Sequence, residues 1–264
     1  MRGDGERRSA PVVFDRVGKR LGSQLVLDDL SFRVGAGERV TLIGPTRAGK
    51  TTILRLLMTL LRPDSGTISV HGEYLFHEWR GGDLVPATEA HVRRLRGRIT
   101  MLFGESNLFP TMRLLRNVTE APVHVLGQQK EQAEQRAREL LTLVGLGNKL
   151  DQYPAQLEPG EQQRAAIARV LAVEPQVLLV DELTAALDPK VAAEVLDVLR
   201  YVADCCDATM LLVSRSLRFT VDVSDRVLMV NGGKIIEEGS PARLFEDPRQ
   251  ERTRAFLRSV VEER

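Results

Sequence analysis

Apolar residues along the chain follow two different periods, which together predict alternating strands and helices. Leu30, Phe32 and Val34 alternate with Ser31 and Arg33, as in a half-buried strand. Short continuous apolar runs predict strands buried on both faces at 39–43, 99–103, 177–180 and 209–213. Apolar residues at helical spacing predict helices at 53–61, 131–144 and 190–202. Strands that alternate with helices in this order indicate an α/β fold.

The remaining segments suggest how the chain is divided. Residues 1–10 are predicted to be a disordered tail, and 11–264 a single domain. Within that domain, a mainly helical stretch at about 105–160 separates two predicted strands and indicates an inserted helical subdomain. Further strands are predicted at 11–17 and around Ile68 and Val70, with a hairpin at 226–230 and 234–238 around Asn231-Gly232-Gly233. Four arginines near a helix at 88–96 are read as a solvated face, with a phosphate patch as the alternative.

One stretch carries a strong signal for phosphate binding. Residues 44–51, Gly-Pro-Thr-Arg-Ala-Gly-Lys-Thr, fit the P-loop pattern G-x-x-x-x-G-K-[ST] between a strand and a helix. The N–H groups and dipole at the start of that helix favour a polyphosphate. Lys50 is predicted to contact the β- and γ-phosphates, and the Thr51 hydroxyl to bind Mg²⁺. The predicted contacts are Gly44, Pro45, Thr46, Arg47, Ala48, Gly49, Lys50, Thr51 and Thr52.

A second landmark is the run Val177-Leu178-Leu179-Val180-Asp181-Glu182. Four apolar residues that end in a carboxylate are typical of a central parallel strand that points an acid at a nucleotide. Asp181 is predicted to hold Mg²⁺, and Glu182 to orient the attacking water. The alternative is a buried strand that happens to end in two acids, and the P-loop upstream argues against it.

Composition restricts the possible functions. The 37 basic and 36 acidic residues nearly cancel, so there is no electrostatic indication of nucleic-acid binding. Cys205 and Cys206 are adjacent and cannot join distant segments, which makes a reducing compartment the default expectation. No apolar run approaches the roughly 18 residues that cross a bilayer, so any membrane role is expected to depend on partners.

From about Val12 to Phe256, the two motifs and the helical stretch between them resemble the ATP-binding cassette (ABC) of membrane transporters. Four further segments resemble the polar amino-acid uptake group of bacterial importers: 107–110, 153–157, 162–169 and 186–189. The segment 117–127 is most similar to ectoine and hydroxyectoine uptake ATPases. The resemblance implies a P-loop NTPase with a RecA-like core, an antiparallel β subdomain and an inserted helical subdomain.

The resemblance also implies partners and a mechanism. Two cassettes, as a homodimer or a heterodimer, enclose two ATP molecules, each between the P-loop of one chain and a signature helix of the other. The cassettes act with two transmembrane permeases and an extracytoplasmic solute-binding protein, as peripheral subunits on the cytoplasmic face of the plasma membrane. ATP and Mg²⁺ are the implied cofactors. Gly160 and Asp188 are the implied contacts from the signature and from the segment after Glu182.

Several positions depart from the family pattern. Leu21 replaces the aromatic ring that stacks on adenine, and Gly104 replaces the glutamine that contacts Mg²⁺ and water. Arg215 replaces the switch histidine, and a guanidinium offers hydrogen-bond donors but no acceptor. The signature Leu-Ser-Gly-Gly-Gln reads Leu-Glu-Pro-Gly-Glu at 157–161. The loss is selective, because the P-loop, Asp181, Glu182 and Asp188 are kept.

The acidic signature can be weighed by charge. A helix N-terminus stabilises an anion by about 0.3–2 kcal/mol. A carboxylate about 5 Å from a phosphate charge costs roughly 3 kcal/mol at an effective dielectric near 20. Glu158 and Glu161 are therefore expected to cancel or reverse the attraction, although an acid, a proline and a second acid also make a favourable helix start.

Three functions remain open at this point. The chain is an ATPase subunit of an ABC importer, or a catalytically impaired nucleotide-binding cassette with a structural or regulatory role in the same assembly. The third is a soluble cassette that acts on ribosomes or DNA. That class usually has tandem cassettes, long coiled-coil inserts and basic surfaces, none of which this sequence shows.

Overall fold

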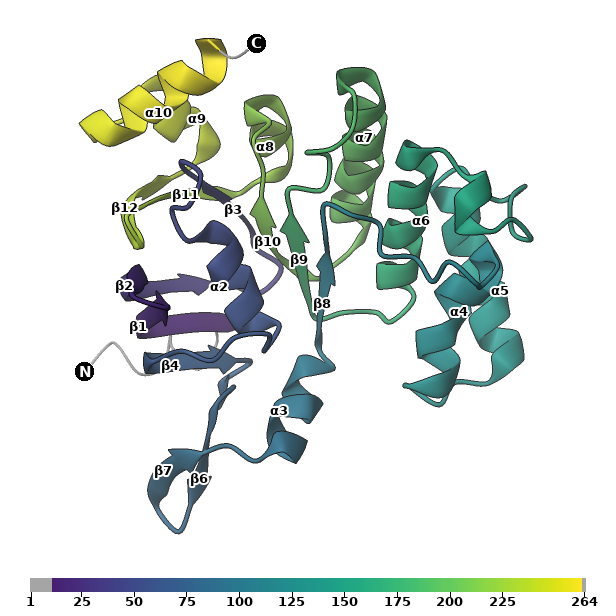
Figure 1. The fold of residues 1–264 in the computed structure, drawn as a ribbon, viewed down its shortest axis with the longest axis horizontal. Helices are drawn as coiled ribbons and strands as arrows, with labels where there is room; N and C mark the ends of the chain where they lie inside the picture. The colour runs from purple at the N-terminus through teal and green to yellow at the C-terminus, as the bar shows by residue number, and fades with distance from the viewer. Residues whose placement is uncertain (1–10, 263–264) are drawn as a thin grey trace. The chain divides into compact units, whose positions relative to one another are not determined.

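The structure is a computed structural model that describes residues 11–262, with side chains for 11–260 (Figure 1). The tail predicted at 1–10 lies outside the described residues. Two compact units share the chain. Unit 1 comprises Met1–Thr100, Gln176–Asp181 and Asp207–Arg264, and unit 2 comprises Met101–Pro175 and Glu182–Cys206. Unit 2 thus includes the stretch predicted at 105–160, extends it on both sides and adds a second segment after Asp181.

A six-stranded sheet supports the P-loop, with strand order β12-β11-β3-β10-β9-β8. Its strands are β3 (Arg39–Ile43), β8 (Ile99–Leu102), β9 (Val177–Asp181), β10 (Thr209–Val213), β11 (Arg226–Asn231) and β12 (Lys234–Gly239). Strand β3 runs parallel to both β10 and β11, and β9 runs parallel to β10. The predicted hairpin is formed by β11 and β12, which pair antiparallel. Strand β9 lies inside the sheet, between β10 and β8, and its four apolar residues are buried, which confirms the interior parallel strand predicted to end at Asp181.

Four helices of unit 1 follow these strands. They are α2 (Lys50–Leu57), α8 (Leu217–Val223), α9 (Pro241–Glu246) and α10 (Glu251–Glu262). Helix α2 ends at Leu57, before the end predicted at residue 61. Thr59 adopts a left-handed conformation, with φ 57°, and the Leu60 N–H donates to the Arg55 carbonyl at 2.9 Å. Together with the bond from the Thr59 N–H to the Leu56 carbonyl at 3.0 Å, this forms a Schellman motif at the helix C-terminus. Leu60 lies beyond the helix and is half exposed.

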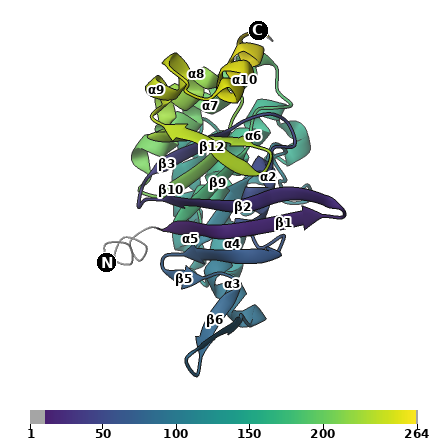
Figure 2. The same cartoon turned by 90° about the vertical axis from the view of Figure 1, so that its left-hand side faces the viewer.

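A second, antiparallel sheet has the order β2-β1-β4-β5. Its strands are β1 (Val12–Leu21), β2 (Gln24–Val34), β4 (Ser65–Val70) and β5 (Glu73–Tyr74). The two long strands β1 and β2 run side by side in Figure 2. Phe14 and Phe32 stack with their ring centroids 4.6 Å apart. The alternation predicted for 30–34 is confirmed, because Leu30, Phe32 and Val34 are all buried.

The segment between β5 and β8 contains a hairpin and a helix. A short hairpin is formed by β6 (His77–Arg80) and β7 (Asp83–Pro86), followed by α3 (Glu89–Arg96). Glu73 accepts hydrogen bonds from Arg94 and Arg98. The Arg94 bond is the main cause that lowers the pKa of Glu73 to about 2. These two arginines are therefore engaged in surface ion pairs, as the solvated-face interpretation expects.

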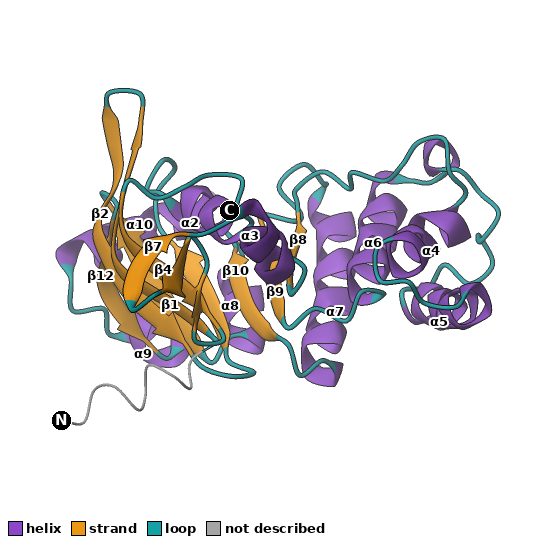
Figure 3. Ribbon diagram, turned by 90° about the horizontal axis from the view of Figure 1, so that it is seen from below, coloured by secondary structure: helices purple, strands orange, loops and turns teal. Residues whose placement is uncertain are grey.

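Unit 2 is helical (Figure 3). It contains α4 (Leu114–His124), α5 (Lys130–Leu143), a 3₁₀ turn at Pro154–Gln156, α6 (Pro159–Leu171) and α7 (Pro189–Cys205). The apolar stripe predicted for α5 is confirmed, because Ala133, Ala137, Leu140 and Leu141 are buried. The N–H groups of Leu114 and Leu115, which start α4, donate to the carbonyls of Gln152 and Leu150. The loop before the 3₁₀ turn thus satisfies donors that have no partner within α4.

Candidate functional site

The P-loop requires its two outer glycines. Gly44 has φ 140°, and a Cβ there would lie 2.1 Å from the Val230 carbonyl oxygen. Gly49 has φ 108°, and its Cβ would lie 2.7 Å from a Leu27 methyl group. Neither contact leaves room for a side chain. The backbone of the loop therefore packs directly against Val230 and Leu27. Packing alone requires glycine at these two positions, in addition to any requirement from ligand binding.

The turn of the β11–β12 hairpin is hydrogen-bonded to the P-loop. The Gly233 N–H donates to the Ala48 carbonyl, and the Asp28 N–H donates to the Gly233 carbonyl, each at 3.2 Å. A Cβ on Gly233 would lie 2.4 Å from the Val26 carbonyl oxygen. The sequence predicted the turn but not this contact, for which the Gly-Gly pair after Asn231 is the only local signal.

Gly44→Ala is expected to lower the free energy of unfolding by about 1–3 kcal/mol, because the backbone must move away from Val230 or accept a disfavoured φ. Denaturant unfolding measures the change. Gly97→Ala is the matched control, since Gly97 has φ −60° and its Cβ would lie 3.4 Å from the nearest heavy atom. Equal stability of the two variants would show that the loop relaxes freely.

Lys50 and Thr51 occupy the start of α2. The Lys50 ammonium is buried and donates to the Gly44 carbonyl at 2.7 Å and to the Pro45 carbonyl at 2.9 Å. It is therefore held over the loop that the phosphates are predicted to occupy. Ala48, Gly49 and Thr52 are also buried, whereas Pro45, Thr46 and Arg47 are exposed. Arg47 adopts a left-handed conformation with φ 66°.

Thr51 and Asp181 lie together although 130 residues separate them. The Thr51 hydroxyl donates to Asp181 Oδ1 at 3.1 Å, across the ends of α2 and β9. A hydroxyl and one carboxylate are the donors with which proteins hold Mg²⁺ when substrate phosphates complete its shell. Among residues 11–260 no cluster of three or more His, Cys, Asp or Glu side chains suits a metal ion. The pair fits Mg²⁺ bound with a nucleotide rather than in an all-protein cage.

Glu182 follows β9 directly and has an unusual backbone. Its φ is 43°, in a region that non-glycine residues seldom adopt, and the next residue, Leu183, is buried. Strain of this kind is common at functional positions. Asp188 accepts hydrogen bonds from the N–H groups of Lys190 and Val191. It therefore caps α7, a structural role that its predicted nucleotide contact does not require.

The other departures have definite places. Leu21 ends β1 and is 43% exposed, and Arg215 is exposed in the segment before α8. The Gly104 carbonyl accepts a hydrogen bond from the Gln163 side chain, which is 4% exposed. Gly160 is buried on α6, where a Cβ would lie 2.4 Å from a Val191 methyl group of α7. Close packing of α6 against α7 thus explains why residue 160 is a glycine, without reference to any ligand.

The signature segment begins α6 as predicted, with Glu158 at the N-cap and Pro159 at the first helical position. Glu161 does not point freely into solvent. Its carboxylate accepts from Lys149 Nζ at 2.6 Å and from the Glu158 N–H at 3.2 Å. Glu161 was expected to repel a phosphate as an unpaired charge. That expectation is wrong, because the Lys149 ammonium neutralises the Glu161 carboxylate. Glu158 is exposed and has no ion pair among residues 11–260.

Burial and hydrogen bonding oppose each other at Glu161. Burial acts to raise the pKa of its carboxyl, but the hydrogen bonds from Lys149 and from the Glu158 N–H outweigh burial and lower it. Glu161 is thus ionised at neutral pH and paired. Sequence reasoning missed Lys149, which lies 12 residues upstream without a motif of its own.

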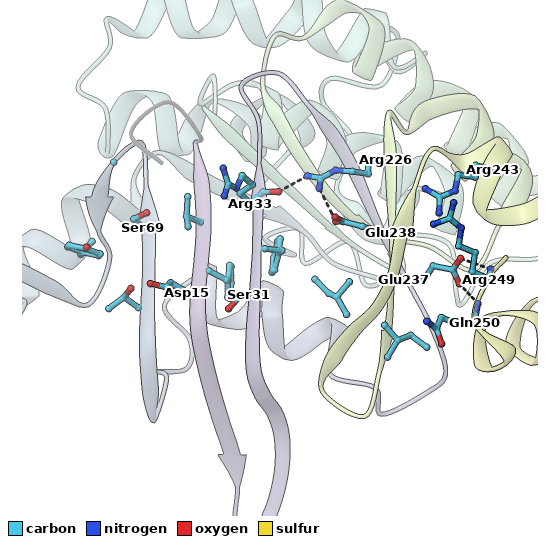
Figure 4. Close-up of a pocket in the computed structure, with 18 of the residues that line it drawn as sticks. Asp15, Ser31, Arg33, Ser69, Arg226, Glu237, Glu238, Arg243, Arg249 and Gln250 are labelled. Atoms are coloured by element: carbon cyan, nitrogen blue, oxygen red, sulfur yellow. Dashed lines mark hydrogen bonds and ion pairs between the residues drawn. The ribbon is translucent and has the colours of Figure 1, made fainter. Parts of the chain in front are cut away.

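A separate groove of about 1220 Å³ lies in unit 1 (Figure 4). It is lined by β1, β2, β4 and β12, and no residue of the P-loop borders it. Two of its charged side chains are already hydrogen-bonded: Arg226 donates to the Glu238 carboxylate and to the Arg33 carbonyl, and Glu237 accepts from the backbone N–H groups of Arg249 and Gln250. Figure 4 marks these bonds with dashed lines. The groove is therefore not the phosphate site.

Within residues 11–262, no helix has both the length and the apolar character needed to span a bilayer.

Comparison with known proteins identifies the family. A family model described as ABC transporter matches residues 27–185, which include the P-loop and Asp181. The chain belongs to the ABC transporter family. Its cassette fold is that of the P-loop NTPases, and family members couple ATP hydrolysis to transport, which makes this chain an ABC-type ATPase.

Relatives match this ABC cassette over nearly its whole length. A probable amino-acid ABC transporter ATP-binding protein of Sinorhizobium fredii is 49% identical, covering 95% of this chain and 98% of that protein. The L-cystine transport system ATP-binding protein of Escherichia coli is 43% identical, covering 92% and 95%. The histidine transport ATP-binding protein of Pseudomonas aeruginosa is also 43% identical, covering 90% and 94%.

Solved structures support the fold of the ABC cassette. A dimeric ATP-binding cassette in a post-hydrolysis state, bound to ADP and phosphate, is 25% identical with a TM-score of 0.73, covering 87% of this chain and 98% of that one. The cbiO1 cassette from Clostridium perfringens is 22% identical with a TM-score of 0.78, covering 90% and 92%.

Proposed function

We propose that this chain is the ATP-hydrolysing subunit of an importer for a polar amino acid. The observation that carries the proposal is the assembly of Lys50, the P-loop carbonyls and the Thr51–Asp181 pair at one end of α2. Lys50 binds the β- and γ-phosphates, and Thr51 and Asp181 hold Mg²⁺, which neutralises phosphate charge when bound. Glu182 orients the attacking water.

The partners follow from the family and from the relatives. Two copies of the cassette, or one copy with a second cassette, enclose ATP between the P-loop of one chain and the α6 N-terminus of the other. A dimeric cassette bound to ADP and phosphate supports this arrangement. The dimer acts with two permeases and an extracytoplasmic solute-binding protein, as a peripheral complex on the cytoplasmic face of the membrane. No nucleic acid takes part.

The transported solute is proposed from the relatives. Cystine, arginine, octopine, glutamine and histidine stand in the names of proteins 38–43% identical to this chain. An ectoine-type compatible solute is the narrower alternative, which rests on the resemblance of segment 117–127. The solute contacts the permease and the binding protein and not the cassette. Residues of the cassette therefore indicate the class of transporter but do not identify its substrate.

The experiment is uptake of labelled solutes by cells that express the chain with the permeases and solute-binding protein of a polar amino-acid importer. Cystine, arginine, histidine and ectoine are the solutes. Uptake that requires the chain and is lost in Glu182→Gln supports the proposal, because that variant keeps the fold while removing the carboxylate. Uptake that persists without the chain would contradict it.

A catalytically impaired cassette of the same transporter is a second candidate. Gly104 and Arg215 favour it, since neither residue offers the side chain that the family uses to contact the water or the γ-phosphate. Such a chain still binds nucleotide through Lys50 and closes on a partner. Turnover by the purified chain separates this candidate from the first.

A further inference from the structure

The starting observation is the pair of Lys149 and Glu161 in unit 2. Lys149 Nζ and Glu161 Oε1 are 2.6 Å apart, and the two side chains are 27% and 15% exposed. The second oxygen of the same carboxylate accepts the Glu158 N–H at 3.2 Å. One carboxylate therefore joins a lysine of the preceding loop to the first turn of α6.

The loop that carries Lys149 is itself fixed. The carbonyls of Leu150 and Gln152 accept the N–H groups of Leu115 and Leu114 at 2.9 and 2.8 Å, and Asp151 pairs with Arg113 at 2.9 Å. Lys149 thus projects from a segment that is tied to the start of α4. Because the backbone of this segment is already ordered, the ion pair of Lys149 costs less backbone entropy than it would on a free loop.

The pair changes the electrostatics at the start of α6. An unpaired carboxylate in the first turn repels any phosphate that approaches the helix N-terminus. With the lysine in contact, the pair carries no net charge, so Glu161 no longer opposes the attraction of the helix N–H groups for an anion, and Glu158 is the negative charge that is left at this helix start. Arg164, on the next turn of α6, adds positive charge near the same carboxylate. The ion pair with Lys149 therefore allows an acid at position 161, where the family has glutamine, without adding net charge to the helix start.

We propose that Lys149 is a positioning residue for nucleotide binding in trans: it neutralises Glu161 and holds that carboxylate on the Glu158 N–H, so that the α6 N-terminus can accept the phosphates of ATP bound to a second cassette. The proposal rests on the proposed function, because it needs the P-loop of one chain to meet α6 of another. It assigns to Lys149 a role in closure of the dimer rather than in chemistry.

The experiment measures ATP-dependent dimerisation by analytical ultracentrifugation, with Glu182→Gln as the parent so that ATP is not consumed. Lys149→Met is expected to weaken dimerisation at least fivefold, and Lys149→Arg to stay within twofold of the parent. Adding Glu161→Gln to Lys149→Met is expected to restore dimerisation to the level of Glu161→Gln alone. Lys130→Met is the matched control, since Lys130 pairs with Glu134 on the exposed face of α5.

The pattern separates a charge role from a structural one. If Lys149→Met dimerises like the parent, or if the double variant stays as weak as Lys149→Met, the proposal is overturned. If Lys149→Met alone does not fold, the double variant is compared with Glu161→Gln alone: equal dimerisation supports the proposal, and a loss overturns it.

Calorimetry of ATP binding to the parent is run in parallel. A parent that binds ATP but does not dimerise overturns the role of Lys149, while the proposed function still stands on binding and uptake. A parent that binds no ATP overturns both. The two failures are therefore distinguishable.

Discussion

Replacing Lys50 with alanine lowers the affinity for MgATP at least tenfold. The substitution removes a charge-assisted contact to phosphate, which contributes about 1.5–3 kcal/mol. It also removes the donor that Gly44 and Pro45 share, so the loop loses a contact that orders it in the absence of ATP. Isothermal titration calorimetry with MgATP measures the affinity, and thermal unfolding checks that the variant is folded.

The control for this prediction is Lys190→Ala, a surface lysine in the first turn of α7. It is expected to bind MgATP as the unmodified chain does. Equal affinities for Lys50→Ala and the unmodified chain would contradict the assignment of the phosphate site. The same titration with GTP tests Leu21, which has no ring to stack on a base, so ATP and GTP should bind within a few-fold of each other.

The second large effect concerns turnover. The purified chain is expected to hydrolyse ATP slowly, and Gly104→Gln together with Arg215→His is expected to raise the rate about a hundredfold. The reason is that a positioned polar or proton-accepting group contributes about 10²–10⁴-fold in enzymes. An arginine at position 215 is expected to attract phosphate charge, but its guanidinium offers hydrogen-bond donors only. Steady-state release of phosphate at saturating MgATP is the measurement.

Two results would contradict this prediction. An unmodified homodimer that turns over at tens per second, a rate common for competent enzymes, would show that the departures are harmless. A repaired chain that keeps its activity after Glu182→Gln would show that the rate does not come from the predicted site. Signature repair with Glu158→Ser, Pro159→Gly and Glu161→Gln should promote dimerisation while leaving hydrolysis slow.

The P-loop and the strand that ends at Asp181 could be predicted because their signals are local. A glycine-rich pattern between a strand and a helix, and an apolar run that ends in an acid, need no knowledge of distant residues. Thr51 and Asp181 were each predicted from their motifs to bind Mg²⁺, and the structure places the two side chains in hydrogen-bond contact. The apolar stripe of α5 was equally local and was confirmed.

The features that could not be predicted depend on contacts between residues that have no recognisable motif in the sequence. Lys149 gains its significance only when the 3₁₀ turn brings it back to Glu161. The end of α2 depends on Thr59 adopting a left-handed conformation, which β-branched residues rarely do. The hairpin of β6 and β7 has a Gly-Gly turn, but its strands are short and its exposed Trp79 gives no apolar alternation.

The position of β3 has a consequence for synthesis of the protein. This strand carries the P-loop at its end, yet both strands that pair with it, β10 and β11, are translated more than 160 residues later. The Gly233 N–H that braces Ala48 comes later still. On the ribosome, the nucleotide loop is therefore complete only when nearly the whole cassette has emerged. Nascent or truncated chains that stop before β11 should therefore fail to retain ATP.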